Sequence, residues 1–198
     1  MIIAISGPSG VGKGSILSRL LEEDKSIGYS VSVTTRSMRP FEMEGKSYYF
    51  RTIEEFDKMI ANNEILEWDE FCGNKYGTPY FALEKHLAEG KDIALDITLP
   101  GAKAIKKHFK DDAITVFLLP PTLEDLETRI RKRDSETEEQ IRARLGSAKQ
   151  ELMQYSICDY VIVNDKIENA VCELRKIIHA ERRRSCRNKD ILKNYNLD

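Results

Sequence analysis

The stretch G-P-S-G-V-G-K at residues 7–13 limits the possible folds more than any other part of the chain. It follows an apolar run at residues 2–5 and precedes an amphipathic segment at residues 15–23, so it connects a predicted strand to a predicted helix. In that setting the G-x-x-x-x-G-K spacing turns backbone N–H groups and a helix N-terminus toward a bound phosphate. The alternative is a glycine-rich turn with an exposed lysine, which the combined spacing and context disfavour.

Apolar runs and amphipathic segments alternate along most of the chain. Runs typical of buried parallel strands lie at residues 2–5, 93–97, 113–119 and 160–163. Helical patterns lie at residues 15–23, 79–89, 102–109, 123–133, 138–155 and 167–178. This alternation predicts an α/β fold of the P-loop NTPase type, with a doubly wound parallel sheet.

The alternation of strand and helix patterns is interrupted between residues 29 and 76, where helical patterns nearly disappear. Strand-like patterns lie at residues 29–34, 47–50 and 64–71, with one short helical pattern at residues 53–60. We therefore expect a small, mostly β insertion that packs beside the α/β core.

Length and composition narrow the class of protein. The chain has 198 residues, which suits one domain with an insertion and is too short for two domains of ordinary size. Charged residues make up 32% of it and nearly cancel, at a net charge of −2, so we expect no nucleic acid partner and only a local anion site. No apolar run reaches membrane-spanning length, and the four cysteines form no metal-binding or disulfide pattern. We expect a cytoplasmic protein with no membrane partner.

The position after Lys13 departs from the usual phosphate-loop pattern. That pattern has a hydroxyl there as a magnesium ligand, whereas this chain has Gly14, with Ser15 one position later. We expect Lys13 to reach the β- and γ-phosphates of a nucleotide. Mg²⁺ would then be held mainly by nucleotide oxygens and water, with Ser15 as a candidate for a contact through water.

Two arginines follow the first strand pattern of the insertion. Arg36 and Arg39 lie three residues apart, and Tyr48 follows after a short loop. A guanidinium group binds phosphate at two points, so both arginines and the Tyr48 hydroxyl can converge on one anion. The alternative is a solvated surface loop, and the spacing alone does not separate the two.

A carboxylate in a predicted strand, Glu67, precedes the one tryptophan of the chain, Trp68. A carboxylate accepts two parallel hydrogen bonds, which guanine offers from N1–H and its exocyclic amine, whereas adenine does not present that pattern. Such a site rejects the wrong base because the carboxylate is left unpaired. Otherwise Glu67 is an exposed strand residue and Trp68 belongs to the core.

The segment from Arg129 to Arg144 is strongly basic, and it includes Arg133. Arginines on a mobile helical segment are suited to neutralise charge on a transferring phosphoryl group. The alternative is a pair of helices held by ion pairs such as Glu138 with Arg142, and the segment alone favours that alternative.

In this order the segments closely resemble guanylate kinase, a P-loop family that transfers a phosphoryl group from ATP to GMP. The likeness covers residues 2–183. It is carried by G-P-S-G-V-G-K-G-S, S-V-S-x-T-T-R-x-x-R-P, G-K-x-Y-x-F, L-E-W, G-N-x-Y-G-T-P and a late V-N-D. The combination is far more specific than any single motif.

The resemblance implies a role for each matching residue. The ATP phosphates would be held by Lys13 and by the loop residues Ser9, Gly10, Val11, Gly12, Gly14 and Ser15, with Asn164 near the adenine. The GMP phosphate would be bound by Arg36, Arg39, Tyr48 and Tyr76, and the guanine by Ser32, Glu67 and Thr78, with Asp96 and Thr98 close to the acceptor. The lid arginines would be Arg129, Arg133 and Arg144, and with Lys13 and Arg36 they form the expected catalytic set.

The resemblance also implies an organisation and a reaction. The core would comprise residues 1–30, 79–128 and 156–184, with a GMP-binding insertion at 31–78, a helical lid at 129–155 and a basic tail at 185–198. The reaction would be direct in-line transfer from ATP to GMP or dGMP, giving ADP and GDP or dGDP, with Mg²⁺ and no covalent enzyme intermediate. The protein would be a monomer or a homodimer.

Three positions depart from the family pattern. Thr98 stands where an acidic residue is usual, Pro100 replaces a glutamine before Gly101, and Asp134 replaces a common lid glycine. The change at Thr98 matters most, because losing a carboxylate affects magnesium or guanine binding. Two rival interpretations stay open: a kinase for another nucleoside monophosphate or a phosphorylated small molecule, and a non-catalytic guanylate-kinase-like binding module.

Overall fold

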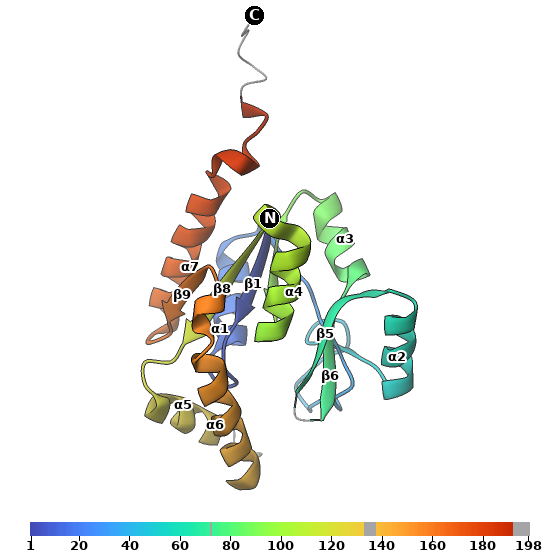
Figure 1. Cartoon of the computed structure of the whole chain (residues 1–198), viewed down its shortest axis with the longest axis vertical. Helices are drawn as coiled ribbons and strands as arrows, with labels where there is room; N and C mark the ends of the chain where they lie inside the picture. The colour runs from blue at the N-terminus through green and yellow to red at the C-terminus, as the bar shows by residue number, and fades with distance from the viewer. Residues whose placement is uncertain (72, 133–137, 192–198) are drawn as a thin grey trace, which may run out of the picture.

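The computed structural model describes residues 1–71, 73–132 and 138–191 and has a five-stranded parallel sheet at its centre (Figure 1). The strand order is β2-β7-β1-β8-β9. The strands are β1 (Ile2–Ser6), β2 (Ile27–Tyr29), β7 (Asp92–Asp96), β8 (Ala113–Leu119) and β9 (Tyr160–Val163). Each neighbouring pair is parallel, which confirms the predicted sheet.

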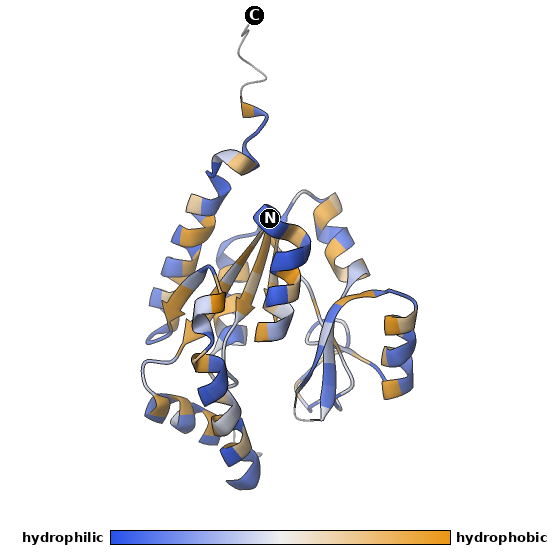
Figure 2. Ribbon diagram, viewed as in Figure 1, coloured by the Kyte–Doolittle hydropathy of each residue, from blue (hydrophilic) through white to orange (hydrophobic). Residues whose placement is uncertain are grey.

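Helices cover both faces of this sheet. α1 (Lys13–Glu23) and α7 (Ile167–Arg182) pack on one face, and α3 (Tyr80–Ala88) and α4 (Leu99–Phe109) pack on the other. Successive side chains of a strand point to opposite faces, so Ile3 of β1 joins the α1 and α7 cluster while Ile2 joins the α3 and α4 cluster. The strands of the central sheet are accordingly apolar along their length (Figure 2).

A second sheet of four strands lies beside the core, as expected for the insertion (Figure 1). Its order is β4-β3-β6-β5, formed by β3 (Val33–Thr34), β4 (Tyr49–Phe50), β5 (Ile65–Phe71) and β6 (Asn74–Pro79). The single helix of this region, α2 (Ile53–Ala61), begins with a capping box between Thr52 and Glu55.

The segment after β8 is helical. α5 (Leu123–Arg131) and α6 (Glu138–Leu152) lie at the lower end of the molecule in Figure 1. Short 3₁₀ turns follow the longer elements at η1 (Lys110–Asp112), η2 (Tyr155–Ile157) and η3 (Ser185–Arg187). Arg133 and Asp134 lie outside the described residues.

Several predicted boundaries differ from the structure, and two of the differences have a clear local reason. The alternating run at 29–34 is two strands in different sheets, because alternation predicts a strand but not its partner. The helix predicted from residue 102 begins at Leu99, since the Thr98 hydroxyl accepts a hydrogen bond from the backbone N–H of Gly101 at 3.3 Å and Pro100 suits the first turn. Strand β6 was not predicted at all.

Within the described ranges, no helix combines the length and apolarity needed to cross a membrane. Cys158, Cys172 and Cys186 are free thiols, and Cys72 lies outside the described residues.

Candidate active site

A cleft of about 520 Å³ lies between the phosphate loop, the second sheet and α6. β1 and β7 end at its floor, where the carboxyl ends of parallel strands commonly bind ligands. Most of the residues singled out from the sequence line it: Ser9, Gly10, Gly12, Lys13, Gly14, Ser32, Arg36, Arg39, Tyr48, Glu67, Tyr76, Asp96, Thr98 and Arg144. Segments far apart in the chain therefore meet at one place.

The phosphate loop joins β1 to α1, with Lys13 as the first residue of the helix. The Lys13 ammonium group donates to the carbonyl oxygen of Gly7 at 2.7 Å and lies 3.9 Å from a carboxylate oxygen of Asp96. Both partners hold the ammonium group over the loop, where a phosphate bound by the helix N-terminus would meet it.

Asn164 and Arg129 lie behind the loop and do not line the cleft. The buried amide of Asn164 donates to the carbonyl oxygen of Val11 at 2.7 Å, and the Arg129 guanidinium donates to the carbonyl oxygens of Val11 and Asn164 at 3.3 and 2.9 Å. Gly12 has a φ of +103°, and a Cβ there would come within 2.5 Å of the Asn164 amide nitrogen. Glycine is therefore required for the loop to rest on this side chain.

Arg36 is held by a carboxylate that the sequence did not single out. Its two terminal nitrogens donate to the two carboxylate oxygens of Glu42 at 3.0 and 2.7 Å. The guanidinium carbon lies 5.4 Å from the centre of the Tyr48 ring, and Glu42, Arg39 and Tyr48 all line the same cleft. We call the side chains expected to bind a phosphate here, Arg36, Arg39, Tyr48 and Tyr76, the cradle. The cradle thus has a carboxylate, Glu42, beside its two arginines.

Glu67 projects from β5 and is almost fully buried, at 8% exposure. The Thr78 hydroxyl donates to one of its carboxylate oxygens at 2.5 Å. The other oxygen lies so close to α4 that a Cβ on Gly101 would come within 2.5 Å of it, so only glycine fits there. Burial raises the pKa of Glu67 to about 7, opposed by the Thr78 hydrogen bond and assisted by the charge of Asp69.

Helix α6 supplies the remaining wall of the cleft. Arg144 donates to the Ser9 hydroxyl at 3.3 Å, which connects α6 to the phosphate loop. Burial raises the pKa of Glu151, and the nearby Lys13 charge opposes that shift.

Besides Asn164 and Arg129, four predicted site residues do not line the cleft or lie outside the described residues. Thr78 acts on the cleft through Glu67, Val11 is buried, Ser15 is exposed on α1, and Arg133 falls in the undescribed segment. Several residues that line the cleft were not predicted from the sequence: Glu42, Asp69, Glu70, Ser147, Gln150, Glu151 and Gln154. Helical spacing groups Ser147, Gln150 and Glu151 on one face of α6, and this signal was available in the sequence.

Comparisons with known proteins agree with this geometry. A family model described as guanylate kinase matches residues 1–181. A guanylate kinase of Desulfitobacterium hafniense is 47% identical over 182 residues, which cover 92% of this chain and 90% of that protein. One of Lactococcus lactis is 46% identical, with coverage of 91% and 88%. The crystal structure of guanylate kinase from Anaplasma phagocytophilum superposes with a TM-score of 0.81 at 34% identity, covering 100% of this chain and 96% of the other.

Proposed function

The chain belongs to the guanylate kinase family and transfers the γ-phosphoryl group of ATP to GMP, and we propose how its own residues divide this work. One observation carries the proposal: Lys13 of the phosphate loop and the buried carboxylate of Glu67 line the same cleft. ATP with its phosphates at Lys13 and GMP with its guanine at Glu67 would point their phosphates toward each other.

The GMP end of the cleft is formed by the second sheet. We assign guanine recognition to Glu67, which accepts from N1–H and the exocyclic amine, with Thr78 fixing the carboxylate and Ser32 beside it. The phosphate of GMP or dGMP would lie between Arg36 and Arg39, with the hydroxyls of Tyr48 and Tyr76 as further donors.

At the transfer end, the chain positions the reacting groups and stabilises their charge. A phosphate oxygen of GMP attacks the γ-phosphorus in line, and ADP leaves without a covalent enzyme intermediate. Lys13 and the loop amides hold the ATP phosphates, and Arg144 reaches the same loop from the lid. Arg129 and Asn164 support the loop from behind, and the assignment of Arg133 to the lid rests on the family likeness alone.

The residues present fit a magnesium ion held largely by the nucleotide. In the described part of the chain, no group of three or more His, Cys, Asp or Glu side chains is placed to hold a metal. The Asp96 carboxylate lines the cleft near Lys13, and Ser15 lies in the first turn of α1. Mg²⁺ typically takes one or two such groups together with phosphate oxygens and waters. When bound, it would neutralise charge on the β- and γ-phosphates.

Several features remain predictions. They are the domain division stated above, the cytoplasmic location, the monomer or homodimer, and the lack of nucleic acid and membrane partners.

The test of the function is an ATP-coupled assay of the purified protein with GMP, dGMP, AMP, UMP and CMP. We expect turnover of GMP and dGMP and rejection of the other three, since none of their bases presents two adjacent donors and at least one of the two hydrogen bonds to the Glu67 carboxylate is lost. Equal turnover of GMP and AMP would contradict the guanine assignment. No turnover together with measurable GMP binding would support the non-catalytic module.

Binding of guanine should depend on pH, because the ionised Glu67 carboxylate accepts both hydrogen bonds. With its pKa at about 7, protons compete with guanine as the pH falls through that value. We expect guanosine, used as a competitive inhibitor without a titrating phosphate, to bind about tenfold more weakly at pH 6 than at pH 8. The inhibition constant measured across this range checks the prediction. The Glu67→Gln variant should show weaker binding with a flat profile, whereas a flat wild-type profile would count against the assignment.

A further inference from the structure

We propose that Glu42 is a positioning residue for the phosphate of GMP, which fixes both arginines of the cradle from a single carboxylate. The proposal rests on the proposed function, because it concerns the same cradle. It adds a residue of opposite charge to a site otherwise made of cations and hydroxyls.

The Glu42 carboxylate is fully engaged by the two arginines. It accepts both terminal nitrogens of Arg36, at 3.0 and 2.7 Å, and the backbone N–H of Arg39, at 2.9 Å. The backbone N–H of Glu42 in turn donates to the carbonyl oxygen of Arg39 at 3.0 Å. The side chains of Arg36 and Glu42 are 16% and 10% exposed, so water competes weakly with the pair.

These contacts orient Arg36 before a substrate binds, together with the Ser37 carbonyl oxygen, which accepts a hydrogen bond from one terminal nitrogen at 2.7 Å. A guanidinium group presents two edges to oxygen ligands, and Glu42 takes the edge formed by the two terminal nitrogens. The Tyr48 ring lies against the guanidinium plane at 5.4 Å, and the Tyr76 hydroxyl lies beside the same group. The remaining edge, which carries the Nε–H, therefore has a fixed direction before a phosphate arrives.

The carboxylate stays ionised in the neutral pH range. Burial acts to raise the pKa of Glu42, but the hydrogen bonds from Arg36 and the Arg39 N–H hold it below its ordinary value. The cradle therefore carries one negative charge when GMP binds. Electrostatics alone would have GMP bind more tightly once that charge is removed, whereas positioning predicts weaker binding. The two explanations differ in the sign of the effect.

The test is Glu42→Gln, which keeps the shape and removes the charge. The amide directs an N–H₂ group at one terminal nitrogen of Arg36, so one of the two parallel hydrogen bonds is lost. We expect the KM for GMP to rise about tenfold, with kcat and the KM for ATP changed less than about twofold. Inhibition by guanosine should be unaffected, because guanosine has no phosphate to reach the cradle.

Glu44→Gln is the matched control, since Glu44 lies in the same loop and also pairs with an arginine, Arg51, at 2.8 Å, but does not line the cleft. This variant should leave the KM for GMP, the KM for ATP and kcat unchanged. If Glu42→Gln fails to fold, Glu42→Asp keeps the charge, withdraws the carboxylate by one methylene group and is expected to raise the KM for GMP alone.

Several outcomes would overturn the proposal. A lower KM for GMP in Glu42→Gln would show that the carboxylate competes with the substrate, and an unchanged KM would show that it does not act on the cradle. Equal weakening of GMP and guanosine would indicate a general loss of structure. If the wild type binds GMP without phosphorylating it, the proposed function fails, and the proposal about Glu42 is then decided by calorimetric dissociation constants for GMP.

Discussion

Replacing Lys13 with alanine is expected to lower kcat about a thousandfold while leaving the KM for GMP within about threefold of the wild type. The ammonium group is held over the phosphate loop by the Gly7 carbonyl and by Asp96, so its charge is in place before ATP binds. Negative charge shifts toward the leaving β-phosphate oxygens in the transition state, and a fixed cation stabilises that state more than the ground state. Steady-state kinetics with ATP and GMP varied separately measure the effect.

Lys25→Ala is the matched control for this prediction. The Lys25 ammonium group also donates to a backbone carbonyl, that of Leu21 at 2.8 Å, but Lys25 follows the C-terminal end of α1 and does not line the cleft. Its kinetic constants should equal those of the wild type. A Lys13→Ala enzyme that keeps more than about a tenth of the wild-type kcat would contradict the role given to the lysine.

The features that the sequence predicted well are those set by short-range spacing. The phosphate loop needs only its glycines, Lys13 and the flanking strand and helix, all within one continuous segment. The alternation of apolar runs likewise predicted four of the five core strands, because buried parallel strands are apolar on both faces. The fifth, β2, has three residues and a glycine at its centre, so it carries too weak a pattern.

What the sequence could not predict are contacts between segments far apart in the chain. Arg129 looks like one of several lid cations, yet it donates to the loop carbonyl of Val11. Glu42 looks like an ordinary loop carboxylate, and its partner is apparent only once Arg36 is fixed by the second sheet. In both cases the residue type suits several roles, and the contact that the side chain makes is seen only in the tertiary structure.

Thr98 departs from the family pattern, but it caps a helix in this structure. Its hydroxyl caps α4, the helix whose first turn contains Gly101 beside the carboxylate of Glu67. Threonine is among the residues that cap helices well, as is aspartate. The substitution therefore keeps the capping function, and what it removes is one negative charge from the cleft.

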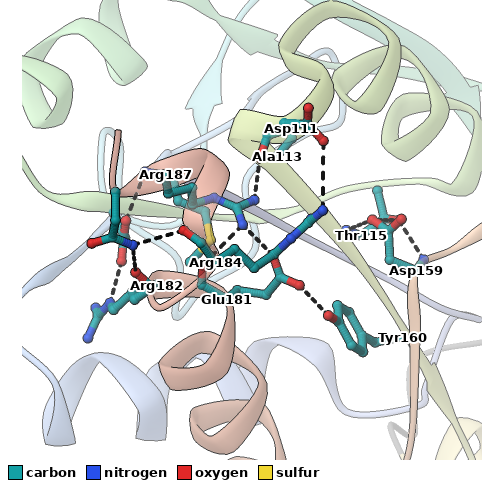
Figure 3. Close-up of polar contacts among 12 residues, drawn as sticks. Asp111, Ala113, Thr115, Asp159, Tyr160, Glu181, Arg182, Arg184 and Arg187 are labelled. Atoms are coloured by element: carbon teal, nitrogen blue, oxygen red, sulfur yellow. Dashed lines mark hydrogen bonds and ion pairs between the residues drawn. The ribbon is translucent and has the colours of Figure 1, made fainter. Parts of the chain in front are cut away.

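A buried ionic network joins the end of α7 to the rest of the core (Figure 3). The Arg187 guanidinium lies between Glu181 and Asp111, donating to the Glu181 carboxylate and to the carbonyl oxygens of Glu181 and Asp111. The Tyr160 hydroxyl donates to the same carboxylate from β9. Arg187 and Glu181 have side-chain exposures of only 9% and 5%, so the charges depend on each other rather than on water.

Replacing Arg187 with alanine is therefore expected to reduce the free energy of unfolding by about 3 kcal/mol, at the lower end of the range for breaking a buried ion pair, because Tyr160 still contacts Glu181. Chemical denaturation followed by circular dichroism measures the loss. Arg184→Ala is the control in the same segment, because Arg184 pairs with Glu181 from an exposed position. It should shift the unfolding midpoint far less.

The pH dependence of the loss identifies its cause. Burial acts to raise the pKa of Glu181, but the hydrogen bonds from Tyr160 and Arg187 keep it lowered, so its stabilising contribution is present above the ordinary glutamate pKa and is lost as the pH falls through the lowered value. Without Arg187 the carboxylate is buried and undercompensated, and protonation relieves it. The difference between wild type and Arg187→Ala should shrink as the pH falls below about 5. Adding Glu181→Gln to the variant should likewise restore part of the stability at neutral pH, whereas a pH-independent loss with no such restoration would assign the effect to packing of the arginine side chain.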